Sequence, residues 1–125
     1  MLIAAFISRA GVCAQLLEDV LTHHELILSD FIVDEVTGTL REKFQYPEGE
    51  IRELRRFLTA TATLVAPAIL PDSLCRDPED IPVLGTAVAG QASVLISVDK
   101  DLLSLRHYEG VLVLKPSQFW KHAMT

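Results

Sequence analysis

The chain alternates between two kinds of apolar pattern, and each kind predicts a different element. Short continuous apolar runs are typical of buried strands, whereas apolar residues that recur at spacings of three and four are typical of amphipathic helices. The continuous runs predict strands at residues 25–28, 63–66, 93–98 and 111–114, after an apolar stretch at 2–7. The spaced patterns predict helices at 12–23, 31–44, 50–61, 101–105 and 116–122, and one more for which Asp80 is the predicted N-cap residue.

The alternation of these strands and helices predicts the fold class. Strands that are separated by helices form parallel sheets, with the helices packed on both sides. The 125 residues are therefore expected to form a single domain, 1–125, of the α/β class with a mainly parallel central sheet. There is no internal repeat and no low-complexity segment that would suggest a different organisation.

Composition indicates the cellular environment that is expected for the protein. Half of the residues are hydrophobic, yet no apolar stretch approaches the length of a membrane-spanning helix. We therefore expect a soluble protein without a membrane partner. Its two cysteines, Cys13 and Cys75, do not form a CxxC pair, and they are interpreted as free thiols of a reducing cytoplasm.

The net charge of −6 argues against a protein that coats nucleic acid without specificity, because that task needs a basic surface. It does not argue against an enzyme that acts on nucleic acid. Clustered carboxylates that hold a divalent cation add negative charge, which the metal then offsets.

Three acidic residues are predicted to lie at one edge of the sheet. Glu35 lies one turn into the helix that follows the strand at 25–28, Asp80 lies at a helix start, and Asp99 follows the strand at 93–98. The carboxyl ends of parallel strands and the helix starts that follow them share one edge, where α/β proteins place their sites. Several carboxylate oxygens in one place suit Mg²⁺ or Mn²⁺.

Each of these acids also has a purely structural interpretation. Asp80, like Asp77, could cap a helix, and Asp99 and Asp101 could accept hydrogen bonds within a turn. Glu35 could simply face solvent on an amphipathic helix. For each residue taken alone the structural interpretation is favoured, and only the coincidence of three acids supports a site.

Four segments of the chain resemble the PIN-domain nucleases. They read LSDFIVDEVTGTLREKF, CRDPEDIPVLGTAVAG, LISVDKDLL and LKPSQFW, in this order. The resemblance covers nearly the whole chain and is strongest to the branch that comprises toxin components of bacterial toxin–antitoxin pairs.

The resemblance implies a three-layer α/β/α sandwich that cleaves single-stranded RNA with Mg²⁺ or Mn²⁺. It implies catalytic and metal-binding roles for Glu35, Asp80 and Asp99, and a further metal-binding role for Asp101. Ser97 takes the place of the family's usual Thr in its T-x-D motif. The implied partners are RNA, a cognate antitoxin protein and a second copy of the chain in a dimer.

The chain departs from the family at its beginning. Family members start with a strand that ends in an Asp-Thr-Asn type motif, followed by a run similar to LIAAFIS. Here Met1 lies within that run, so the first strand and the first acid are expected to be missing, unless the natural protein starts upstream. Their loss would weaken metal binding and expose sheet edges that a partner chain would cover.

Two other functions stay open at this point. The missing acid favours a catalytically inactive PIN-like module that docks an antitoxin or another subunit. A phosphoryl-acceptor signalling domain also has acids at strand ends and a Lys-Pro pair near its last strand, as Lys115-Pro116 does here. It ranks lower, because its acidic pair at the first strand and its acceptor aspartate have no good counterparts.

Overall fold

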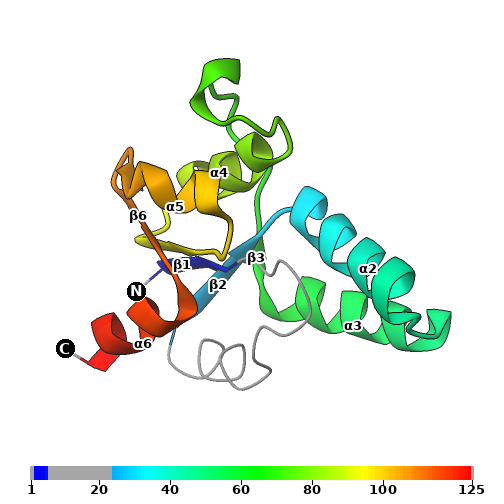
Figure 1. The fold of residues 1–125 in the computed structure, drawn as a ribbon. Helices are drawn as coiled ribbons and strands as arrows, with labels where there is room; N and C mark the ends of the chain where they lie inside the picture. Colours follow the sequence, from blue (N-terminus) through cyan, green and yellow to red (C-terminus); the bar gives the residue numbers. More distant parts are fainter. Residues whose placement is uncertain (1, 6–23, 125) are drawn as a thin grey trace.

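A six-stranded sheet runs through the centre of the protein, as the computed structural model shows for residues 2–5 and 24–124 (Figure 1). The strand order is β3-β2-β1-β4-β6-β5, and every neighbouring pair is parallel except β5 and β6. The described elements are β1 (Leu2–Ala5), β2 (Glu25–Leu28), α2 (Asp30–Phe44), α3 (Glu48–Thr61), β3 (Thr63–Leu64), the 3₁₀ helix η1 (Asp72–Leu74), α4 (Asp80–Ala89), β4 (Val94–Ile96), α5 (Lys100–Leu105), β5 (His107–Tyr108), β6 (Val111–Leu114) and α6 (Pro116–Met124).

The sheet has a strand at its centre, which corrects the expectation that this strand would be missing. Ile3 of β1 pairs in register with Leu26 of β2 on one side and with Val94 of β4 on the other. The apolar stretch at the front of the chain is suited to this place, because inner parallel strands are covered on both faces. It brings no carboxylate to the site, however, since the first acidic residue of the chain is Glu18.

Most of the predicted elements are confirmed, with small shifts at their ends. α2, β2 and β6 match their predicted ranges to within a residue, whereas α3 begins two residues early and β3 is only two residues long. The antiparallel strand β5 was not predicted. It pairs with β6 through a tight turn at Glu109 and Gly110, whose φ angles of 49° and 81° are left-handed. The helix predicted at 12–23, together with Cys13, lies outside the described residues.

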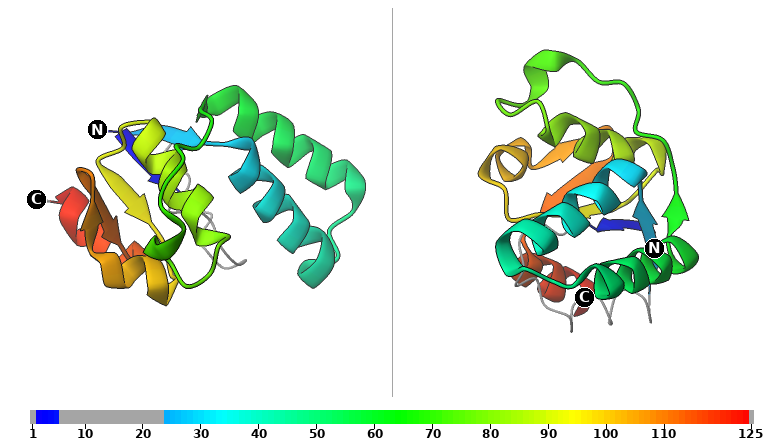
Figure 2. Two further views of the ribbon diagram at one scale, coloured as in Figure 1. Left: turned by 90° about the horizontal axis from the view of Figure 1, so that it is seen from above. Right: turned by 90° about the vertical axis from the view of Figure 1, so that its right-hand side faces the viewer.

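Helices cover both sides of the sheet, which confirms the predicted α/β arrangement. α4 and α5 lie on one side and α6 on the other, while α2 and α3 run antiparallel to each other beyond the sheet (Figures 1 and 2). Leu84 of α4, Leu95 of β4 and Phe119 of α6 are fully buried between these layers. None of the helices in the described part of the chain has the length and apolarity needed to cross a bilayer.

Glycine lets α4 pack unusually close to its surroundings. A Cβ atom on Gly85 would lie 2.5 Å from the carbonyl oxygen of Ala68, and one on Gly90 would lie 2.5 Å from Cγ2 of Ile27. The contact at Gly85 is between two backbones, and the Ala68 amide donates a hydrogen bond to the Gly85 carbonyl at 2.9 Å. The linker that follows β3 is therefore held directly against α4, the helix that begins with Asp80.

The substitution Gly85→Ala tests this close packing. We expect it to lower the free energy of unfolding by about 1–2 kcal/mol, because overpacking against a backbone atom outweighs the gain in helix propensity. Gly38→Ala in α2 is the matched control, since no atom lies within 4 Å of the Cβ position there. The control should gain up to about 1 kcal/mol. Urea denaturation of both variants measures the difference, and equal stabilities would contradict the packing argument.

Candidate functional site

Asp80 is the first residue of α4 and its carboxylate is not used to cap that helix. The residue at the N-cap position is Glu79, which has helical backbone angles and makes no side-chain capping bond. The prediction that Asp80 is the cap residue is therefore wrong by one position. Asp77 Oδ1 accepts a hydrogen bond from the Glu79 amide at 3.0 Å, within the turn that precedes α4.

Asp99 is fixed by the turn that leads from β4 into α5. Its Oδ1 atom caps α5 by accepting from the amides of Asp101 at 2.9 Å and Leu102 at 3.2 Å. Its own amide donates to the hydroxyl of Ser97 at 3.0 Å, and Ser97 is only 3% exposed. The capping interpretation of Asp99 is thus confirmed, and it holds the carboxylate in one orientation at the sheet edge.

Asp80, Asp99 and Asp101 converge at this edge. Each offers one carboxylate oxygen, and the three oxygens lie within 4.8 Å of one another. Asp80 is 8% exposed, and its Oδ2 atom is buried with no hydrogen-bond partner among the described residues. A buried acceptor without a donor is costly, so this oxygen is available for a cation.

The electrostatics of the cluster show how strongly the carboxylates interact. Burial raises the pKa of Asp80 from its ordinary value of 3.8 to about 7, together with the charges of Asp99 and Asp77, a hydrogen bond with Asp99 and the charge of Asp101. Without a cation, Asp80 therefore stays protonated up to pH values well above those at which an ordinary aspartate ionises. A divalent cation would stabilise the ionised form of the same group.

Glu35 lies beside this cluster and not within it. Its side chain is exposed on α2, and its pKa is raised by partial burial and by the charges of Glu79, Asp77 and Asp99. Its neighbour Asp34 faces away and accepts a hydrogen bond from Arg55 of α3 at 2.6 Å. Of these two adjacent acids, only Glu35 therefore lies toward the cluster.

A buried pair of hydroxyl groups sets the position of α2 relative to α4. Ser29, the N-cap of α2, and Thr86 of α4 are fully buried, and their hydroxyl oxygens lie 2.7 Å apart. This contact joins the helix that carries Glu35 to the helix that carries Asp80. No pattern in the sequence pointed to Thr86.

Cys75 is a buried free thiol beside the site, which confirms the interpretation of this residue as a free thiol. Its burial, and next the charge of Asp80, raise the pKa of the thiol. Because the thiolate is the nucleophilic form, these surroundings disfavour a catalytic role for Cys75.

The structure thus brings together Asp80, Asp99 and Asp101 and places Glu35 within electrostatic reach of them. Their catalytic and metal-binding roles stay predictions. Sequence reasoning missed an apolar groove that begins at the same helix start and is lined in part by Pro67, Ile69 and Ile81. The available signal was the run PAILP at 67–71, which is too apolar for an ordinary solvent-exposed linker.

Comparison with known proteins places the chain in a family. The family model for the PIN domain matches residues 1–101. The chain therefore belongs to the PIN-domain family, and its functional class in broad terms is that of a nuclease. No curated protein matches the chain.

The raised pKa of Asp80 predicts how stability depends on pH in the absence of metal. Between the unfolded and folded pKa values the folded chain binds more protons, so stability should fall as pH rises from about 4 to about 7 and then level off. Asp80→Asn removes the cost of ionising a buried carboxyl group at high pH. We expect it to be more stable than the native chain by about 1–3 kcal/mol at pH 8, and nearly equal at pH 4.

Thermal denaturation in EDTA across this pH range measures the effect. Glu42→Gln, a change of an exposed acid on α2, is the control and should follow the native profile. A variant Asp80→Asn that loses as much stability with rising pH as the native chain would contradict the assignment of the raised pKa.

Proposed function

We propose that this protein is an endoribonuclease that uses Mg²⁺ or Mn²⁺ to hydrolyse single-stranded RNA. The observation that carries the proposal is the convergence of Asp80, Asp99 and Asp101 around a buried, unpartnered carboxylate oxygen of Asp80. Membership of a nuclease family makes a substrate with phosphodiester bonds the natural one for this site.

The donor set fits a hard divalent cation. Asp80, Asp99 and Asp101 supply only carboxylate oxygens, which Mg²⁺ and Mn²⁺ prefer, and such ions commonly keep several waters. The ion would lower the pKa of a bound water and stabilise negative charge that develops on the phosphate. Asp99 needs little reorganisation for this role, because the cap of α5 and the Ser97 hydroxyl already hold it in place.

Glu35 is suited to accept a proton during hydrolysis. It is exposed, and its raised pKa makes it a better base than an ordinary surface carboxylate. In the proposed step a water oxygen forms a bond to phosphorus while the bond to the leaving ribose oxygen breaks. One proton of the water passes to Glu35, and the leaving oxygen takes a proton from solvent.

The biological role in this proposal is that of the toxin in a toxin–antitoxin pair, active in the cytoplasm. The support is the resemblance of four segments of the chain to that branch of the family. The proposed partners are accordingly an RNA substrate, a cognate antitoxin protein and a second copy of the chain in a dimer.

A second candidate function is a binding module that does not cut RNA. A specific observation favours it: β1 carries no acid to the site, since the first seventeen residues contain neither Asp nor Glu. In this alternative the chain keeps the PIN fold and docks an antitoxin or another subunit. The phosphoryl-acceptor domain has no comparable support and is not retained.

Cleavage of a single-stranded RNA in the presence of Mn²⁺ tests the proposed enzyme. We expect EDTA to abolish cleavage, and Asp80→Asn and Asp99→Asn to lower the rate at least about 100-fold, because each removes a charged ligand of the ion. The control Asp34→Asn alters an exposed acid that pairs with Arg55 and should retain activity. Cleavage that survives EDTA, or that is equal in Asp99→Asn and the native chain, would refute the proposal.

Calorimetric titration with Mn²⁺ separates the two candidate functions. The enzyme should bind the ion with a heat that Asp99→Asn loses, and it should cut RNA under the same conditions. Specific Mn²⁺ binding without any cleavage would show that the site lacks a ligand needed for catalysis. If the chain neither binds Mn²⁺ nor cleaves RNA, the result would support the binding module.

A further inference from the structure

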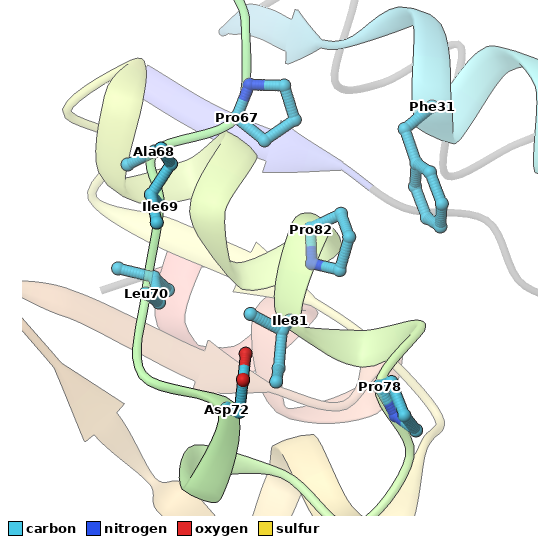
Figure 3. A pocket seen from close by; sticks show the side chains of 9 residues that line it. All are labelled: Phe31, Pro67, Ala68, Ile69, Leu70, Asp72, Pro78, Ile81 and Pro82. Atoms are coloured by element: carbon cyan, nitrogen blue, oxygen red, sulfur yellow. The ribbon is translucent and has the colours of Figure 1, made fainter.

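An apolar groove opens next to the carboxylate cluster. It has a volume of about 700 Å³ and lies between the linker that follows β3, the start of α4 and the first turn of α2 (Figure 3). A smaller hollow of about 340 Å³ shares Phe31 and Pro67 with it. The lining includes a large, almost fully exposed side chain, Ile69, which is 99% exposed. Lysine, arginine and histidine are absent from both linings.

Two walls of the groove are formed by helices that also carry acidic residues of the site. On α2, Phe31 lines the groove and Glu35 follows it by four residues, so the two side chains lie on the same helix face. On α4, Ile81 and Pro82 line the groove and come immediately after Asp80. The groove and the acidic residues therefore share α2 and α4, which favours a ligand that extends from one to the other.

One carboxylate points into this otherwise apolar space. Figure 3 shows Asp72, at the start of η1, with its oxygens directed toward Ile81. Asp72 forms no hydrogen bond or ion pair with the residues that the structure describes. Asp72 is exposed to solvent at the edge of the groove. An acceptor with two oxygens beside an apolar groove matches a ligand that presents flat apolar faces and hydrogen-bond donors at its edge.

We propose that the groove binds one unstacked base of the single-stranded RNA, with Phe31 as the stacking surface and Asp72 as the acceptor for the base edge. The inference rests on the proposed function, which brings RNA to the neighbouring carboxylates. Proteins recognise single-stranded RNA by stacking splayed bases on aromatic rings and by hydrogen bonds to their Watson–Crick edges. The lack of basic residues suits a base and disfavours a phosphate.

The position of Asp72 selects among the bases. Guanine presents two neighbouring donors, N1–H and the N2 amino group, to a carboxylate. Uracil presents a single N–H group between two carbonyl oxygens, and a carboxylate repels these oxygens. The groove is therefore expected to prefer guanine and to reject uracil.

Fluorescence anisotropy of labelled pentanucleotides in EDTA tests this inference, because no cleavage takes place without metal. The probes are UUGUU and UUUUU. We expect the native chain to bind UUGUU about tenfold more tightly than UUUUU, and Asp72→Asn to lower this ratio below about threefold. Phe31→Leu should weaken the binding of UUGUU about fivefold or more, because it keeps apolar volume and removes the stacking surface.

Phe57→Leu is the matched control. Phe57 is a comparably large aromatic side chain on α3, 47% exposed and outside the groove lining, so its loss should leave both affinities unchanged. Circular dichroism of each variant confirms that the fold is retained. No binding of UUGUU, or equal affinities in the native chain, Phe31→Leu and Asp72→Asn, would overturn the proposal.

Two further outcomes are informative. Groove variants that convert a dimer to a monomer in analytical ultracentrifugation, without any effect on RNA affinity, would assign the groove to a contact between copies and overturn the inference. Selective binding of UUGUU with no cleavage in Mn²⁺ would support the groove while refuting the nuclease. The two proposals therefore fail separately.

Discussion

Repulsion between the carboxylates at one edge of the sheet is the physical constraint on which the candidate site depends. The fold brings Asp80, Asp99 and Asp101 together, and burial and the neighbouring charges raise the pKa of Asp80 to about 7. A purely structural role does not require such an arrangement, because a single cap would satisfy each helix start at less cost. The opposing charge of a cation turns the same arrangement from a penalty into a binding site.

The supports of this edge are largely neutral hydrogen bonds. The Ser97 hydroxyl accepts a hydrogen bond from the amide of Asp99, whose carboxylate accepts two from amides of α5. A hydrogen bond between the hydroxyls of Ser29 and Thr86 joins α2 to α4. Neutral groups can hold acids in place without adding to the local charge. A cation such as lysine at one of these positions would instead compete with the metal, and the described residues of the cluster form no ion pair with one.

The sequence predicted the fold well because its strands and helices differ clearly in apolar spacing. It predicted that Asp80 and Asp99 would converge, because one opens a helix and the other follows a strand of a parallel sheet, whereas Glu35 lies beside the cluster and not within it. The roles of these residues stay predictions. It could not predict the two-residue strand β5 or the exact start of α4, which depend on a turn and on one residue of cap geometry. It was wrong about the centre of the sheet, because pairing of Leu2–Ala5 with two distant strands is a tertiary effect.

The backbone hydrogen bond between Ala68 and Gly85 links the apolar groove to the helix that carries Asp80. It joins one wall of the apolar groove to α4, the helix whose first residue is Asp80, and no side chain separates the two backbones at Gly85. A movement of the linker away from α4 would have to break this hydrogen bond or carry the helix with it. A ligand that displaced the linker would therefore also act on α4, the helix whose first residue is Asp80.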